Sequence, residues 1–145
     1  MRKIIVAAVL SAFLVVPAFS LAEATVARVI DGDTIVLACG ERVRLIGVDA
    51  PEVGRPGADR ATGFVRERVE GRTVWLEADG RDRDAHGRLR RYVWLRQPTN
   101  ARDANQIRRY LLNAQLLSYG LARVVIIGNV RNEAIFRQLE REAGQ

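Results

Sequence analysis

Cysteine, histidine and lysine are almost absent from this sequence, which holds Cys39, His86 and Lys3 as the single example of each. One cysteine cannot form an intramolecular disulfide, and neither a cysteine-based zinc site nor a site with several histidines can be built. A Ser–His–Asp triad would have to use His86, since there is no other histidine. The sequence also contains no repeats and no low-complexity segment.

The basic residues are therefore nearly all arginine. Lys+Arg is 23 against an Asp+Glu count of 17, which gives a formal net charge of +6 and a pI near 10.6. Arginine is always charged and binds phosphate or carboxylate groups through a planar fork. This positive charge favours an acidic partner, with nucleic acid as the first candidate. Many proteins are basic without binding nucleic acid, so the charge alone does not identify the partner. The 145 residues, 48% of them hydrophobic, fit one folded domain.

The N-terminus has the pattern of a signal peptide. Arg2 and Lys3 form a basic start, the run Ile4–Phe19 is almost wholly apolar, and small residues lead up to Ala22. The apolar run is shorter than the ~20 residues that a membrane-spanning helix needs.

We therefore predict a signal peptide over residues 1–22 and a mature domain over residues 23–145. Cleavage after Ala24 and an uncleaved anchor are the alternatives. A cleaved chain would be secreted or periplasmic, without a stable association with the membrane.

Alternation and turn residues predict a mainly β (α+β) protein. Five short strands are expected at Thr25–Ile30, Thr34–Ala38, Val43–Val48, Thr73–Ala78 and Leu89–Leu95. Helices are expected at Asp59–Glu70, Ile107–Tyr119 and Asn132–Ala143. This pattern favours a five-stranded OB-fold β-barrel with about three packed helices, an architecture that often binds nucleic acids.

Acidic residues flank the second and third expected strands. Asp33 precedes the second strand, Asp49 and Glu52 follow the third, and a short turn at Cys39 joins the two strands. The expected register places Asp33 opposite residue 46 or 47, so the three carboxylates gather at one end of the sheet. Their mutual repulsion would be relieved by a hard divalent cation such as calcium. In the alternative interpretation these acids only build turns or face solvent.

Three segments resemble the signature segments of the staphylococcal nuclease family, in the family's order and at compatible separations. They are Val29-Ile30-Asp31-Gly32-Asp33-Thr34, then Arg44-Leu45-Ile46-Gly47-Val48-Asp49-Ala50-Pro51-Glu52, then Asp84-Ala85-His86-Gly87-Arg88. Asn113 and Tyr119-Gly120-Leu121-Ala122-Arg123-Val124 resemble a later segment of the family. The resemblance covers roughly residues 25–143.

The resemblance implies a five-stranded OB barrel with three helices, and a secreted, calcium-dependent endonuclease that cuts DNA and RNA and leaves 3′-phosphate ends. Site residues follow by matching positions. Asp33 and Asp49 match the carboxylates that bind the one calcium ion, and Ala50 would add its main-chain carbonyl. Glu52 matches the residue that orients or deprotonates the attacking water. Arg44 and Arg88 match the arginines that bind phosphate. His86 stands where the family's type member has a substrate-contacting tyrosine.

The chemistry of these residue types agrees with the implied roles. A phosphodiester gathers negative charge on its oxygens in the transition state, which a calcium ion neutralises. Two guanidinium forks add charge-assisted hydrogen bonds to the same oxygens. A carboxylate beside the metal can accept a proton from the attacking water.

The sequence departs from the family in several places, among them a loop after Glu52 that is shorter than the one in the family's type member. The two tyrosines that follow Gly-Leu-Ala in the type member are replaced by Ile126 and Gly128, and the stretch Pro98–Arg109 reads as an insertion. The family pattern also places a short strand before a helix that begins near Asn113, in place of one helix over Ile107–Tyr119.

Two other functions compete with a nuclease. One is a non-catalytic OB-type module that binds nucleic acid or protein, and the other is a small-molecule or peptide-binding barrel. All five positions are filled, by Asp33, Arg44, Asp49, Glu52 and Arg88, whereas degenerate members of the family usually lose some of them. A small-molecule barrel would leave both arginines without a role, so the sequence favours a nuclease. We expect this nuclease to act as a monomer, although the sequence itself does not fix the oligomeric state.

Overall fold

Five strands of the computed structural model, which describes residues 1–8 and 20–144, close into a barrel in the order β1-β2-β3-β6-β5. They are β1 (Ala22–Asp31), β2 (Thr34–Leu37), β3 (Arg42–Leu45), β5 (Thr73–Glu77) and β6 (Leu89–Trp94). A separate two-stranded sheet pairs β4 (Val48–Asp49) with β7 (Arg123–Val124). The expected five-stranded barrel is confirmed.

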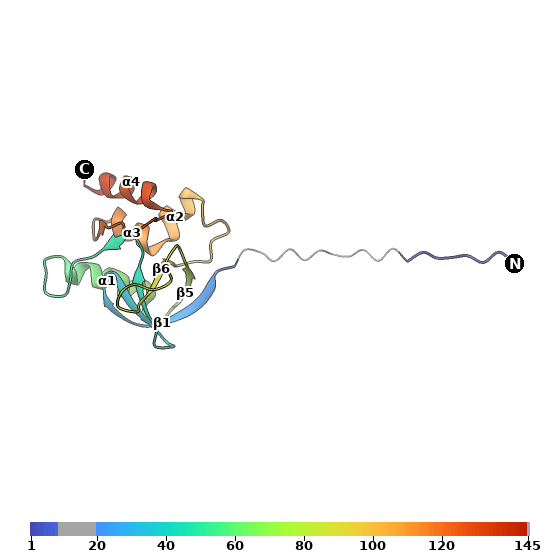
Figure 1. Ribbon diagram of the computed structural model, residues 1–145, viewed down its shortest axis with the longest axis horizontal. Helices are drawn as coiled ribbons and strands as arrows, with labels where there is room; N and C mark the ends of the chain where they lie inside the picture. The colour runs from blue at the N-terminus through green and yellow to red at the C-terminus, as the bar shows by residue number, and fades with distance from the viewer. Residues whose placement is uncertain (9–19, 145) are drawn as a thin grey trace.

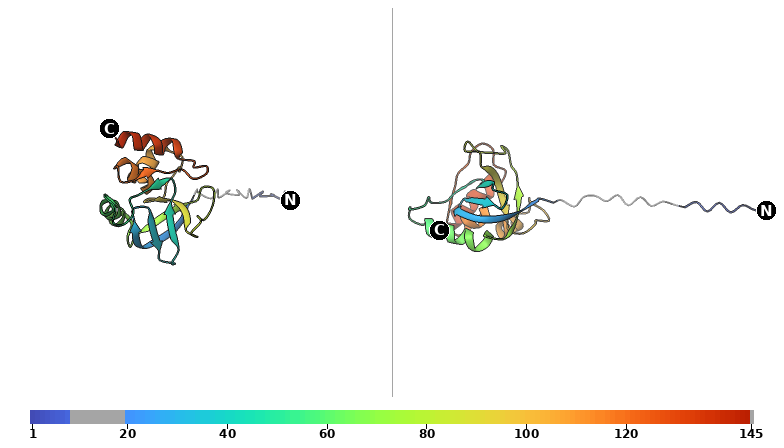
Figure 2. Two further views of the ribbon diagram at one scale, coloured as in Figure 1. Left: turned by 60° about the vertical axis from the view of Figure 1, so that its left-hand side comes forward. Right: turned by 90° about the horizontal axis from the view of Figure 1, so that it is seen from below.

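Four helices occur in this described part, against the three expected: α1 (Ala58–Val69), α2 (Ala104–Tyr110), α3 (Leu112–Ser118) and α4 (Glu133–Ala143). Figure 1 shows α2, α3 and α4 gathered beyond one end of the barrel, while α1 runs along its side. A turned view gives the same arrangement (Figure 2). The helices α2, α3 and α4 therefore form a layer at one end of the barrel.

The single helix predicted over Ile107–Tyr119 is wrong, because the backbone breaks at Leu111. This residue is extended (φ −87°, ψ 117°) and forms a β-bridge with Trp94. Burial of the Leu111 side chain and the bridge to Trp94 stabilise the chain more than another turn of helix would. The start of α3 at Leu112 agrees with the family pattern, whereas α2 and one bridge stand where that pattern has a short strand.

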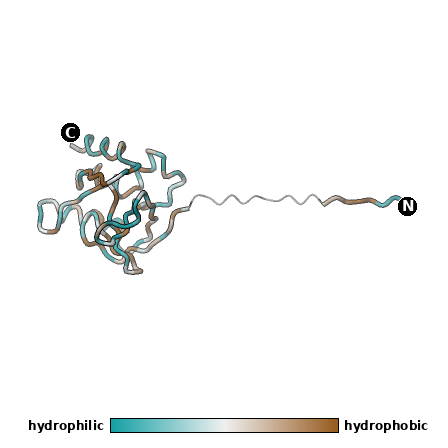
Figure 3. The backbone as a smooth tube through the Cα atoms, viewed as in Figure 1, coloured by the Kyte–Doolittle hydropathy of each residue, from teal (hydrophilic) through white to brown (hydrophobic). Residues whose placement is uncertain are grey.

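The hydrophobic core fills the barrel and continues into the helical layer. Figure 3 shows hydrophobic segments along the strands and in α3. The largest fully buried side chains include Trp94, Tyr92, Phe136, Ile35 and Leu45. Helix α3 packs against α2, α4 and β6, and this burial removes apolar surface from water on nearly every side of the helix.

A buried asparagine connects the helical layer to the site. Asn113 in α3 is fully buried, accepts a hydrogen bond from the Val93 N–H (3.0 Å) and donates one to the Ile46 carbonyl (2.9 Å). Buried polar groups are costly unless paired, so these bonds hold the chain between β3 and β4 in one place.

The third expected strand, Val43–Val48, is split into β3 and β4 at Gly47. This glycine has φ +77°, and a Cβ atom at its position would lie 2.8 Å from the Phe136 ring. The left-handed backbone conformation and the close ring both require glycine here, and they turn the chain away from the barrel. Asp49 therefore leaves the barrel wall and lies on β4.

The register of the β2–β3 hairpin also differs from the expected one. Thr34 pairs with Arg44, and the Asp33 carbonyl accepts a hydrogen bond from the Leu45 N–H (2.9 Å). Asp33 is therefore opposite Leu45, not residue 46 or 47. The turn takes three residues, with Gly40 at φ +93°, and this shifts the pairing.

The predicted signal peptide, residues 1–22, is described only in part, because residues 9–19 lie outside the described residues. In the parts that are described, no helix combines the length and the apolar character needed to cross a membrane. Strand β1 begins at Ala22, which pairs with Leu76 of β5.

Gly32 gives a first prediction, because its turn packs closely on two fixed alanines. A Cβ atom at Gly32 would lie 2.7 Å from the Ala50 Cβ and 2.8 Å from the Ala61 Cβ. We expect Gly32→Ala to lower the free energy of unfolding by about 1–3 kcal/mol, measured by urea denaturation. The control is Gly63→Ala in α1, where a Cβ atom meets open space. It should leave stability unchanged or raise it by up to about 1 kcal/mol, so equal losses in both variants would contradict the packing argument.

Candidate active site

Asp33 is a buried carboxylate at the turn between β1 and β2, with only 5% of the residue exposed. Its Oδ2 accepts a hydrogen bond from the Ala50 N–H (2.8 Å), and its Oδ1 accepts one from the Thr34 hydroxyl (2.9 Å). The Asp33 N–H donates to Asp31 Oδ1 (3.0 Å), as in an Asx turn. These bonds fix the carboxylate and tie the turn to the segment that follows β4.

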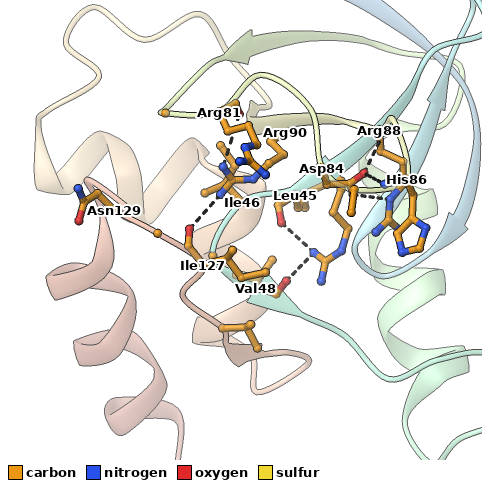
Figure 4. A pocket seen from close by; sticks show the side chains of 16 residues that line it. Leu45, Ile46, Val48, Arg81, Asp84, His86, Arg88, Arg90, Ile127 and Asn129 are labelled. Atoms are coloured by element: carbon orange, nitrogen blue, oxygen red, sulfur yellow. Dashed lines mark hydrogen bonds and ion pairs between the residues drawn. The ribbon is translucent and has the colours of Figure 1, made fainter.

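Arg44 of β3 joins the two aspartates that the sequence singled out. Its Nε lies 3.5 Å from Asp33 Oδ1, and its Nη2 lies 3.2 Å from Asp49 Oδ1. Its Nη1 donates to the carbonyls of Leu45 (2.8 Å) and Val48 (2.6 Å), both drawn as dashed lines in Figure 4. The guanidinium thus bridges the end of β3, the start of β4 and the turn between β1 and β2.

The electrostatics of Asp33 reflect its burial. Removal from water raises the pKa of the Asp33 carboxyl, while the Arg44 guanidinium and the Ala50 N–H act in the opposite direction. A second positive charge close to Asp33 would favour the ionised form further, in the way that a cation lowers the pKa of any nearby acid.

Asp49 is paired with a second arginine. Strand β4 pairs with β7, which places Asp49 opposite Arg123. Asp49 Oδ2 accepts hydrogen bonds from Arg123 Nε (3.3 Å) and Nη2 (3.2 Å). Since the Arg123 side chain is 76% exposed, solvent screening makes this pair weak, and Asp49 is open to another cation.

Glu52 lies three residues beyond β4, in an exposed loop beside Asp49. It lines a cleft of about 580 Å³. The other lining residues are Asp49, Ala50, Pro51, Arg55, Gly120, Leu121, Ala122 and Arg123. Within residues 20–144, no hydrogen bond to the Glu52 carboxylate is formed, so both of its oxygens are available to solvent or to a ligand in the cleft.

Arg88 is held by the loop between β5 and β6. Its Nε donates to Asp84 Oδ2 (2.6 Å), and Asp84 Oδ1 accepts from the backbone N–H groups of Arg88 (3.0 Å) and His86 (2.9 Å). Partial burial acts to raise the pKa of Asp84, but these hydrogen bonds outweigh it and the pKa is lowered. The ionised Asp84 therefore orients Arg88 through Nε, which leaves the terminal nitrogens of the fork to face other ligands.

Arg44, His86 and Arg88 line one cleft of about 670 Å³, shown in Figure 4. Arg44 of this cleft contacts Asp49, which lines the cleft of Glu52, so this ion pair links the two sets of lining residues. An anion bound at Arg44 would therefore lie close to Asp49.

The expected gathering of acids is confirmed for Asp33 and Asp49 and not for Glu52. Within residues 1–8 and 20–144, no group of three acidic, histidine or cysteine side chains is placed to hold a metal. Asp33 and Asp49 approach the same guanidinium, and Glu52 lies beyond them in the adjoining cleft.

Two supporting residues were missed by the sequence reasoning. Asp84 orients Arg88, and Arg123 binds Asp49. Both belong to segments that were recognised, and an acid four residues before an arginine was a usable signal for Asp84. No sequence signal pointed to Arg123, because its contact with Asp49 depends on the pairing of β4 with β7.

Gly128, one of the two residues predicted to stand in place of the family's tyrosines, lines this cleft, and Ile126 is not among its lining residues. His86 contributes the single aromatic ring among the described residues that line this cleft.

Comparison with known proteins finds a family model described as staphylococcal nuclease homologue, which matches residues 42–145. The chain is 34% identical to a thermonuclease of Staphylococcus intermedius over 128 residues, covering 81% of this chain and 69% of that protein. It is 34% identical to a thermonuclease of Staphylococcus hyicus over 107 residues, covering 68% and 56%. It is 33% identical to the protein ParB of Escherichia coli over 130 residues, covering 88% and 71%.

Proposed function

Since this chain belongs to the staphylococcal nuclease homologue family and is a nuclease that hydrolyses phosphodiester bonds, we propose that it is a calcium-dependent endonuclease acting on DNA and RNA. The observation that carries the proposal is the Arg44 guanidinium. It contacts Asp33 and Asp49 together and lines the same cleft as Arg88. This arrangement supports the binding of an anionic substrate and a cation next to each other.

Arg44 and Arg88 would bind the scissile phosphate. Both line the larger cleft, and each is oriented by bonds to the protein that hold its guanidinium in place. As negative charge grows on the phosphoryl oxygens in the transition state, fixed donors stabilise it without reorganising. His86 is exposed in the loop that precedes Arg88, and it would contact the substrate beside the two arginines.

Glu52 would orient the attacking water and accept its proton. Its free carboxylate in the adjoining cleft supports this role. The water oxygen forms a bond to phosphorus while the bond from phosphorus to the 5′-oxygen breaks. The leaving oxygen takes a proton and becomes a 5′-hydroxyl, and the other product ends in a 3′-phosphate.

The donors present fit one calcium ion. The Asp33 and Asp49 carboxylates and the Ala50 main-chain carbonyl would hold it, since calcium prefers hard oxygen ligands. The buried Asp33 carboxylate, bound to the Ala50 N–H, already brings this backbone segment to the acid. When bound, the ion would supply positive charge to the phosphoryl oxygens.

We further propose that the chain is secreted or periplasmic and acts as a monomer. The basic start and the apolar run that follows it support a signal peptide over residues 1–22. The start of β1 at Ala22 supports a domain that begins close to the proposed cleavage point.

The proposed function predicts that cutting depends on calcium. The full chain would be expressed in a bacterial host, recovered from the medium or periplasm, and its mass compared with that of residues 23–145. Supercoiled plasmid, single-stranded DNA and RNA would then be incubated with it in calcium and in chelator. We expect cleavage of all three in calcium and none in chelator, because the phosphate charge is then left without the cation.

A folded protein that cuts none of the three substrates under either condition would overturn the proposal in favour of a nucleic-acid-binding module. Equal cutting in calcium and in chelator would overturn the calcium site alone. Retention of full-length protein in the cytoplasm or membrane would overturn the signal peptide.

A further inference from the structure

Tyr119 is an exposed aromatic residue at the edge of the Glu52 cleft. It is 64% exposed, and the next residue in the chain, Gly120, lines that cleft. Its ring lies 5.2 Å from the Phe64 ring of α1, and the Arg68 guanidinium lies 3.3 Å above Phe64 and 5.9 Å from Tyr119. The two rings are tilted by 51°, and this cluster, called the Tyr119 stack below, holds Tyr119 in place while most of the residue remains in solvent.

Hydrogen bonds continue from this stack toward α2. Arg68 Nε donates to Gln115 Oε1 (3.2 Å), and Gln115 Nε2 donates to the Arg109 carbonyl (2.8 Å). Arg109 is exposed at the end of α2, within the stretch that departs from the family pattern. The Tyr119 stack and the C-terminus of α2 are therefore neighbours.

A second stack lies at this end of α2. The guanidinium groups of Arg96 and Arg109 lie 5.2 Å and 5.8 Å from the Tyr110 ring, and Arg96 Nη1 donates to the Tyr110 hydroxyl (3.0 Å). Both arginines are exposed. Two cations thus surround one half-buried ring on the outer surface.

We propose that these two stacks form a binding track for single-stranded nucleic acid, leading from the Glu52 cleft to α2. The arginine–aromatic track consists of Phe64, Arg68, Arg96, Arg109, Tyr110 and Tyr119. Alternating cations and rings suit such a strand, because every base has a stacking face and every nucleotide has a phosphate. The proposal rests on the proposed function, since it extends the substrate beyond the cleavage site.

The charge of the track supports this partner. Arg96 and Arg109 form no ion pair within the described residues 20–144, whereas neighbouring Arg108 is bound by Glu142. Glu67 lies 3.9 Å from Arg68 but is 82% exposed, so solvent screens it.

The test measures binding of fluorescein-labelled oligodeoxythymidines of 4 and 14 nucleotides, in chelator so that no cutting occurs. We expect wild type to bind the longer strand at least tenfold more tightly. The double variant Tyr119→Ala/Arg109→Ala should lose most of this gain and show a smaller salt dependence. Tyr119→Phe should retain the gain, since it keeps the ring. The matched control is Arg28→Ala/Arg72→Ala, at exposed arginines on and beside the barrel strands, which should also retain it.

Thermal unfolding of each variant would show that the fold is kept. If the double variant keeps the gain with length, the track is overturned while the nuclease remains. If wild type cleaves in calcium but shows no gain with length, the same conclusion follows. If wild type neither binds nor cleaves either strand, the proposed function fails, and with it the basis for a track.

Discussion

Glu52→Gln is expected to lower kcat for DNA cleavage by about 100- to 10,000-fold while the protein stays folded. Loss of a positioned general base typically has this effect. Glu52 is exposed and its carboxylate forms no hydrogen bond in the described part of the chain, so glutamine should leave the free energy of unfolding unchanged. Single-turnover cleavage of a labelled oligonucleotide in saturating calcium, with urea denaturation alongside, measures both quantities.

The control is Glu23→Gln, at an exposed glutamate on β1 far from both clefts. It should cut at the wild-type rate. Wild-type cutting by Glu52→Gln would remove Glu52 from the mechanism. Loss of folding would instead make it a structural residue, and calcium titration by calorimetry would then decide whether the ion site is lost with it.

Arg44→Lys is expected to lower kcat by about 100-fold or more and to destabilise the protein. Lysine keeps the charge but has no planar fork, so it cannot serve Asp33, Asp49 and the Val48 carbonyl together. One missing transition-state donor typically reduces kcat by about 100- to 1000-fold. Carbonyls left without a donor should lower the free energy of unfolding by about 1–3 kcal/mol. Cleavage kinetics and urea denaturation measure the two losses.

Two further lysine variants separate the roles. Arg88→Lys should reduce cutting comparably with little change in stability, because the Arg88 side chain bonds only Asp84 among the described residues. Arg42→Lys, at an exposed arginine on the same strand as Arg44, should change neither. If Arg44→Lys were as active and as stable as Arg42→Lys, the central role of Arg44 would be wrong.

Local patterns were sufficient to predict the barrel strands and the long helices, because alternation and turn residues report on a residue's near neighbours. The break at Leu111 was not predictable in this way. It depends on a bridge to Trp94, which is distant in sequence. The split at Gly47 likewise depends on the Phe136 ring from α4. Long-range packing decided both positions.

The site was predictable from the chain to different degrees. The hairpin alone brought Asp33 and Asp49 together, although its register was wrong. Nothing in composition or spacing distinguished Arg44 and Arg88 from the other arginines, and the family resemblance was needed to select them. The contact of Asp49 with Arg123 required the pairing of β4 with β7, which only the fold provides.

The order of the barrel strands also determines at which point during synthesis the barrel can close. Strand β3 pairs with β6, so the wall stays open until Trp94 has been made. At a synthesis rate of about 5–20 residues per second, this leaves the first three strands without their later partners for seconds. Arg88, Asn113 and Arg123 are made later still in this order of the chain. A nascent chain therefore lacks part of its barrel wall and part of its candidate site until most of the chain has been synthesised.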